Sequence, residues 1–191
     1  MPRRTLGLLL IVGACGLLGS GGWIHTKAWL AQCLLERSWL AKLDGESQPR
    51  PWPWADTWPV AVLEAPGQGA RRLVLSGASG RNMAFGPTHL SASAAPGTRS
   101  NTVLFGHRDT HFAFLQHLAA GDRLLLTSAD GGQHQYTVDD LLVVHEREMW
   151  VTEPTDEAQL TLVTCYPFDA LIPGGPLRYV VRARRRDPVG P

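Results

Sequence analysis

Cys165 ends the segment LTLVTC, in which residues 160–164 have the apolar character of a buried strand. Pro167 follows closely and should stop the strand, so we expect the thiol at the rim of a sheet, where loops build functional sites. A lone cysteine is most often an unreactive core residue. As a thiolate stabilised by a cation or an imidazole, it is instead a nucleophile. These residues alone leave both roles open.

His107 is the histidine whose setting best matches that of Cys165, because it also follows an apolar strand-like segment, NTVLFG. His111 lies four residues further on. The pair has the i, i+4 spacing of two zinc ligands, but no third or fourth ligand with suitable spacing accompanies it. Most of the other histidines are interpreted as ordinary surface or loop residues: His25, His89, His117, His134 and His145.

Arg178 is the third residue whose position suggests chemistry, because it opens the strand-like segment LRYVVRAR. A guanidinium at a sheet rim can bind a carbonyl oxygen or a developing oxyanion. A surface salt bridge is the alternative role. Arg182 and Arg184 alternate with Arg178 along the same segment, so spacing alone does not single it out.

Short strands are the elements that would position these residues. From Val60 onward, short apolar segments are separated by Gly, Pro, Asp and Ser, and only THFAFLQHL is typical of a short helix. About seven or eight such strands predict a closed barrel or a sandwich. The strand-like segments are VAVLEA, RRLVLS, NTVLFG, DRLLLTS, HQYTVDDLLVVH, QLTLVTC and LRYVVRAR.

The composition is that of a globular protein, with 191 residues, 44% of them hydrophobic and 18% charged. This length suits one domain with an appendage. The net charge of only +1 gives no indication of nucleic-acid binding. Three cysteines, at positions 15, 33 and 165, are too few and too unevenly spaced for a disulfide framework.

The N-terminus predicts a membrane segment. Arg3 and Arg4 precede a run without charge from Thr5 to Ile24, and about 20 residues of helix span about 30 Å, the thickness of the hydrocarbon core. The positive-inside rule keeps residues 1–4 in the cytoplasm. We therefore predict a single-pass signal anchor over residues 5–25 in the cytoplasmic membrane, with the remaining chain on the extracytoplasmic side.

Two other interpretations of this segment remain. The small residues 19–21 near its end suit a cleaved secretory signal, and VGAC, ending at Cys15, resembles a lipoprotein signal. All three interpretations place the domain beyond the cytoplasmic membrane. An unpaired thiol there is exposed to oxidation, which favours a functional reason for keeping Cys165.

Residues 26–57 are predicted to connect the anchor to the domain. The segment KAWLAQCLLERSWLAKL has roughly helical apolar spacing and predicts a juxtamembrane amphipathic helix with Cys33 on its apolar side. Prolines then end the helix. A plain linker has little use for tryptophan, so we expect Trp52, Trp54 and Trp58 to dock on the domain.

The sequence around the three candidate residues resembles that of the sortases, the cysteine transpeptidases of bacterial cell surfaces. TLVTC matches the hallmark TLxTC of that family, FGHRDTHF its histidine segment and PLRYVV its arginine strand. The resemblance covers about residues 58–185 and leaves 186–191 as a basic, flexible tail. PWPWADTWPVAVLEAP resembles the start of the marine proteobacterial type, which implies a Gram-negative source.

This resemblance implies a mostly β fold, an eight-stranded sortase-type barrel with short helices behind an N-terminal transmembrane helix. It also implies the reaction: Cys165 attacks an LPXTG-like C-terminal sorting signal between Thr and Gly, and an amine resolves the thioester. His107 would be the general acid and base, and Arg178 would position the substrate and stabilise the oxyanion. Thr164 would line the acyl site, with Asp109 and His111 in supporting roles.

The implied partner is a secreted protein that carries the sorting signal, and the amine acceptor is unidentified. Calcium activates some sortases through acidic loop residues. Glu153, Asp156 and Glu157 are available here without a ligand pattern, so we predict no cofactor and no obligatory metal. Two other functions remain open: a hydrolase of the cysteine-peptidase type that releases surface proteins, and a non-enzymatic barrel that binds an envelope partner.

Overall fold

The structure is a computed structural model, and it describes residue 23 and residues 26–172 and 174–185. The predicted anchor over residues 5–25, apart from Trp23, and the tail 186–191 lie outside the described residues. In the part of the chain that is described, no helix is both long and apolar enough to cross a membrane.

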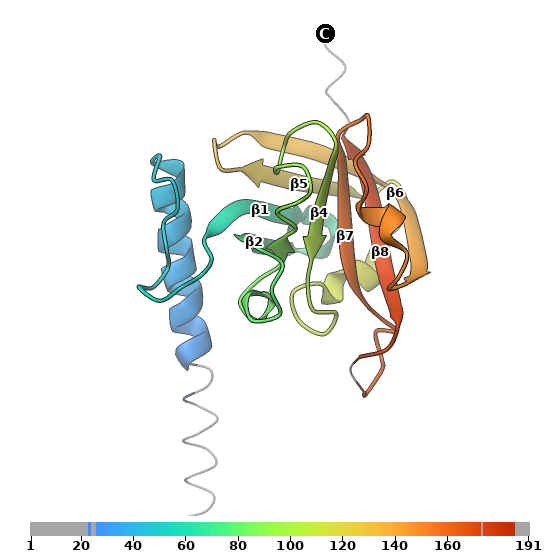
Figure 1. The fold of residues 1–191 in the computed structure, drawn as a ribbon, viewed down its shortest axis with the longest axis horizontal. Helices are drawn as coiled ribbons and strands as arrows, with labels where there is room; N and C mark the ends of the chain where they lie inside the picture. Colours follow the sequence, from blue (N-terminus) through green and yellow to red (C-terminus); the bar gives the residue numbers. More distant parts are fainter. Residues whose placement is uncertain (1–22, 24–25, 173, 186–191) are drawn as a thin grey trace, which may run out of the picture.

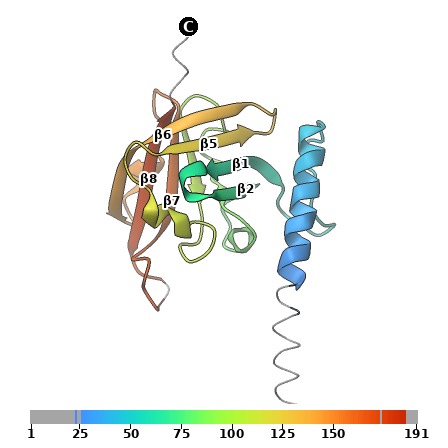
Figure 2. The same cartoon turned by 180° about the vertical axis from the view of Figure 1, so that it is seen from behind.

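Eight described strands form a closed barrel with the neighbour order β1-β2-β3-β4-β7-β8-β6-β5 (Figures 1 and 2), which confirms the predicted barrel. The strands are β1 (Pro59–Ala65), β2 (Ala70–Ser76), β3 (Thr88–His89), β4 (Asn101–Phe105), β5 (Arg123–Ser128), β6 (Gln133–His145), β7 (Gln159–Tyr166) and β8 (Leu177–Arg185). Four 3-10 turns accompany them: η1 (Pro66–Gln68), η2 (Asn82–Ala84), η3 (Ala113–His117) and η4 (Met149–Thr152). The turn η3 falls in the segment predicted to be helical.

Strands β4 and β7 pair in parallel, whereas β7 pairs with β8 and β8 with β6 in antiparallel fashion. Parallel neighbours end at the same edge of a sheet. The residues that follow β4 therefore lie beside the end of β7, at the edge where β8 begins.

Apolar side chains fill the inside of the barrel, and a second apolar cluster lies on its outer face. Leu160 and Leu162 of β7 belong to the central core. The next residue, Val163, belongs to a separate cluster with Val103 and Val180. Because successive side chains of a strand point to opposite faces, this second cluster lies on the outer face of β4, β7 and β8.

A helix over residues 26–43 stands against the side of the barrel (Figure 1). Its Leu35 and Trp39 are buried in a cluster with residues of β1 and β2: Val62, Leu73 and Leu75. Glu36 on the same helix forms an ion pair of 2.6 Å with Arg71 of β2. The helix is therefore part of the folded domain.

The predicted apolar face of this helix is wrong. Cys33, expected on that face, is exposed, and Trp29 and Leu30 are 67% and 50% exposed. The buried positions 35, 38 and 39 follow helical i, i+3, i+4 spacing, but it is packing on the barrel that buries them and not the neighbouring apolar positions.

The prediction that the linker tryptophans dock on the domain has a mixed outcome. Trp52 packs on Phe85 with 5.1 Å between ring centroids, whereas Trp54 is 83% exposed.

Strand β3 was not among the predicted segments, and it changes the interpretation of His89. This histidine was expected on the surface or in a loop, yet it is buried between β2 and β4. Its Nε2 lies 2.9 Å from the carbonyl oxygen of Ala94 and 3.2 Å from Ser93 Oγ. Burial lowers the pKa of His89, and the bond to Ala94 opposes that effect.

Candidate active site

The register of β4 and β7 brings His107 level with Cys165. Val103 pairs with Thr161, and Phe105 pairs with Val163. The pairing continues beyond β4, because the backbone N–H of Gly106 donates to the carbonyl oxygen of Val163 at 3.2 Å. Two further residues along each strand, on the same outer face, are His107 and Cys165.

Arg178 lies on the other side of the thiol. Cys165 and Arg178 are direct partners in the antiparallel pairing of β7 with β8. Side chains opposite each other in such a pair share one face, with Cβ atoms about 4.5–5.5 Å apart. All three residues are half-buried. His107, Cys165 and Arg178 therefore form a row across three adjacent strands, which we call the catalytic row.

Thr164 lies on the opposite face of β7 from Cys165 and is buried. Its hydroxyl donates a hydrogen bond of 2.7 Å to the carbonyl oxygen of Gly106. The contact ties β7 to the residue that precedes His107, which is a positioning role. Its predicted contact with the acyl group stays a prediction.

The segment that carries His107 turns sharply around a buried ring. A Cβ added to Gly106 would come within 2.8 Å of Cγ and Cδ2 of Phe112, so a side chain at this position would force the ring or the backbone to shift. The N–H of Phe112 donates to the carbonyl oxygen of His107 at 2.9 Å. Arg108 donates through Nη2 to the carbonyl oxygen of Ala170 at 2.7 Å, joining this segment to the β7–β8 connection.

Arg178 is held by three hydrogen bonds. Nη2 is 2.6 Å from Glu146 Oε2, and Nη1 donates to the carbonyl oxygens of Gly175 at 2.6 Å and Leu177 at 2.9 Å. Arg178 thus does form the salt bridge considered as its alternative role, and it does so while lying beside Cys165. These three bonds use Nη1 and Nη2 as donors, and none of the three uses the Nε–H of the guanidinium.

His111 lies on a different side of its loop from the catalytic row. It lines a cleft with Arg72 of β2 and Glu36 of the helix. Its ring Nε2 is 3.4 Å from the carbonyl oxygen of Ala84. Burial lowers the pKa of His111, and the charges of Arg72 and His107 add to that effect. Asp109 is exposed in the intervening turn. Substrate contacts for both residues stay predictions.

Among the described residues, no group of three His, Cys, Asp or Glu side chains is arranged to hold a metal ion. The acidic residues of the β6–β7 loop, Glu153, Asp156 and Glu157, are exposed.

Two features of the site were not predicted. One is an aromatic group just beyond the thiol, in which Tyr166 stacks on Tyr179 at 6.2 Å and Phe168 meets Tyr179 at 5.2 Å between ring centroids. Burial raises the pKa of Tyr179, and Tyr166 adds to that shift. In the sequence, the aromatic residues that flank Pro167 are the pattern from which this group could have been predicted. The other is the apolar outer floor beside Cys165, which Val151 of η4 covers.

Comparisons with known proteins show the family to which this chain is similar. The family model described as the sortase domain matches residues 63–186. Sortase D of Bacillus subtilis is 30% identical over 124 residues, which cover 65% of this chain and 62% of that protein. The chain thus spans less than two thirds of that relative.

Solved structures show the same fold. Sortase C-1 of Actinomyces oris is 27% identical with a TM-score of 0.62, over 68% of this chain and 75% of that one. The Sortase D5 transpeptidase of Clostridium perfringens is 22% identical with a TM-score of 0.61, over 80% of this chain and 89% of that one.

Proposed function

The chain belongs to the sortase family of cysteine transpeptidases, and we propose that it cleaves an LPXTG-like sorting signal and transfers the acyl group to an amine. The observation that carries this proposal is the catalytic row: His107, Cys165 and Arg178 lie on one face of three adjacent strands. This placement supports a reaction in which Cys165 is the nucleophile, His107 the proton carrier and Arg178 the cation that act on one carbonyl group.

In the first half-reaction, the Cys165 thiolate attacks the carbonyl carbon between Thr and Gly of the signal. The negative charge moves to the carbonyl oxygen, where Arg178 stabilises it. The C–N bond then breaks while His107 donates a proton to the departing amine. The product is a thioester between Cys165 and the threonine carbonyl.

In the second half-reaction, an amine attacks the thioester carbon and His107 accepts a proton from it. The C–S bond breaks and Cys165 leaves as the thiolate. Because the thioester conserves acyl energy, the new amide forms without ATP.

An LPXTG-type peptide incubated with the folded protein tests this reaction, with and without an added amine. Mass spectrometry should find the amine adduct and a covalent acyl-enzyme on Cys165. Cys165→Ala should abolish cleavage and leave the fold intact. Turnover that survives in Cys165→Ala refutes the mechanism, and free acid alone in the presence of amine favours the hydrolase.

A thiol-directed substrate mimic with a threonine-like electrophile separates both enzymes from a non-enzymatic binding barrel. Labelling of Cys165 in the folded protein supports catalysis. A folded protein that is not labelled supports the binding barrel.

The proposal includes a location on the extracytoplasmic side of the cytoplasmic membrane of a Gram-negative cell. Arg3, Arg4 and the uncharged run after them support a single-pass anchor. PWPWADTWPVAVLEAP supports the marine proteobacterial type. Membrane fractionation, with mass determination of the N-terminus, separates an intact anchor from a cleaved signal and from lipid attachment at Cys15.

A further inference from the structure

Residues 99–101, which lie at the start of β4, hold the loop between β6 and β7. Asn101 donates through Nδ2 to the carbonyl oxygens of Val151 at 3.1 Å and Glu153 at 3.0 Å. Arg99 donates through Nε to the carbonyl oxygen of Asp156 at 2.7 Å. One short segment thus binds backbone at three positions of a loop about 50 residues away in sequence.

Ser100 completes this set from an unfavourable conformation. Its φ of 83° is the one positive value among the described residues other than glycine. Its Oγ accepts the N–H of Thr155 at 3.0 Å, and its carbonyl oxygen accepts the N–H of Gln159 at 3.0 Å. Such a conformation persists only where surrounding contacts impose it. We call Arg99, Ser100 and Asn101 the 99–101 clasp.

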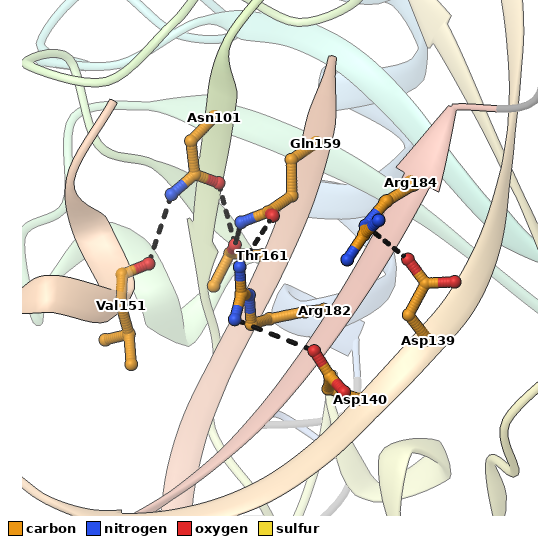
Figure 3. Close-up of polar contacts among 8 residues, drawn as sticks. All are labelled: Asn101, Asp139, Asp140, Val151, Gln159, Thr161, Arg182 and Arg184. Carbon is orange, nitrogen blue, oxygen red and sulfur yellow. Dashed lines mark hydrogen bonds and ion pairs between the residues drawn. The ribbon is translucent and has the colours of Figure 1, made fainter. Parts of the chain in front are cut away.

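A buried chain of hydrogen bonds fixes the direction in which the Asn101 amide points (Figure 3). Arg182 donates to Gln159 Oε1 at 3.0 Å, Gln159 Nε2 donates to Thr161 Oγ1 at 3.0 Å, and Thr161 Oγ1 donates to Asn101 Oδ1 at 2.7 Å. Since the amide oxygen accepts, the amide NH2 must face the loop carbonyls. Asn101, Gln159 and Thr161 are each at most 5% exposed, so water cannot easily replace these bonds.

The loop that the clasp holds lies over the floor next to the thiol. Val151 is buried in the cluster with Val103, Val163 and Val180 on the outer face, and Val163 precedes Cys165 by two residues. Arg182, which begins the hydrogen-bond chain, also lies 5.6 Å from the ring centroid of Trp150. The clasp therefore binds the backbone of the loop whose Val151 packs on the outer floor beside Cys165.

We propose that Arg99, Ser100 and Asn101 are positioning residues that hold residues 150–157 as a preformed wall of the peptide groove. The role of the wall rests on the proposed function. A wall fixed before binding lowers the entropic cost of ordering the loop around an extended peptide. Its loss should weaken peptide binding while the chemistry at Cys165 remains.

Asn101→Asp tests the clasp, because it removes both donors while keeping the shape of the side chain. Ser100→Ala is the second variant, since it removes only the acceptor for Thr155 and disturbs the buried chain less. Thr98→Ala is the matched control, because the Thr98 hydroxyl lies in the same connection and donates only to Ala95 and Arg99 carbonyls. Circular dichroism and thermal unfolding establish that each variant keeps the barrel.

Hydrogen exchange of residues 150–157 measures the clasp without a substrate. We expect exchange about tenfold faster or more in both clasp variants, and unchanged exchange in Thr98→Ala. For an LPXTG-type peptide we expect KM to rise about fivefold to tenfold with kcat nearly unchanged, since uniform binding is lost. Alkylation of Cys165 by iodoacetamide should keep its rate.

Unchanged exchange in both folded variants overturns the clasp. Faster exchange with an unchanged KM shows that the clasp holds the loop but that the loop is no peptide wall, which overturns the proposal. A fall in kcat with an unchanged KM also overturns it, because the residues then act on the chemistry. A wild-type protein that turns over no peptide refutes the proposed function, whereas the exchange data still decide on the clasp.

Discussion

Gly106→Ala is the substitution that tests most directly whether the position of His107 sets the activity. Gly106 lies between the end of β4 and His107, and both of its backbone hydrogen bonds go to β7. Its φ is not in the left-handed region, so alanine is compatible with the backbone. The effect of the substitution should therefore come from the added methyl group alone.

The added methyl would meet a ring that cannot easily move. The Cβ would lie 2.8 Å from two ring atoms of Phe112, against 3.4 Å where ordinary contact begins. Phe112 is fully buried and meets Phe114 edge-on at 6.0 Å. Either the ring or the backbone must therefore move by about 0.6 Å, and overpacking of this kind costs about 1–3 kcal/mol.

A displacement of that size should change kcat more than it changes the stability of the fold. A misplacement of about 1 Å can cost about 100-fold in rate, so we expect kcat to fall about tenfold to 100-fold. Steady-state kinetics with the sorting-signal peptide measure this loss, and urea unfolding measures the stability. Gly67→Ala is the matched control, because no atom lies within 4 Å of its added Cβ and its rate should not change.

Phe112→Leu provides the second half of the test. Removing part of the ring should relieve the clash, so the double variant with Gly106→Ala should lose less activity than the two single effects combined. Full activity in a stable Gly106→Ala protein would refute the argument that the ring fixes His107. Strictly additive losses in the double variant would refute the clash as the cause.

Three further predictions follow from single contacts. Leu35→Ala should lower the free energy of unfolding by about 2–5 kcal/mol in urea, because Leu35 is fully buried, whereas Cys33→Ser should change it by at most about 0.5 kcal/mol. Glu146→Gln should lower kcat several-fold without unfolding the barrel, because it removes the charge that holds Arg178; an unchanged rate would show that the ion pair has no positioning role. The His89 contribution to stability should be complete above its ordinary pKa of 6.5 and be lost as the pH falls from 6.5 through the lowered folded pKa, because burial lowers the folded pKa and the unfolded chain binds the proton more readily. Unfolding curves at several pH values should show a shallower pH dependence in His89→Gln.

The catalytic row was predictable because each of its members stands at a strand end. The sequence shows an apolar strand that stops at or just before His107 and Cys165, and a strand that begins at Arg178. The sequence pattern could not show that β4 and β7 are parallel neighbours, which is what brings two of these ends together. The family resemblance implied that the three residues share one site, without giving the strand pairing that joins them.

Other features depend on tertiary context and left no local signal. The helix over residues 26–43 carries apolar residues on more than one face, so only the barrel decides that Leu35 and Trp39 are buried and Cys33 is not. Strand β3 has two residues, too few for an alternating pattern to appear. The 99–101 clasp contacts a loop about 50 residues away, and hydrophobic periodicity relates only residues that are close in the sequence.

The pairing of β4 with β7 is the feature on which both the catalytic row and the clasp depend. A shift by one residue would turn His107 away from the outer face and separate it from Cys165. Side-chain hydrogen bonds oppose such a shift at both ends of the pair: Thr161 donates to Asn101 at its start, and Thr164 donates to the Gly106 carbonyl at its end. The two threonines of TLVTC thus hold the register that brings the cysteine beside its histidine.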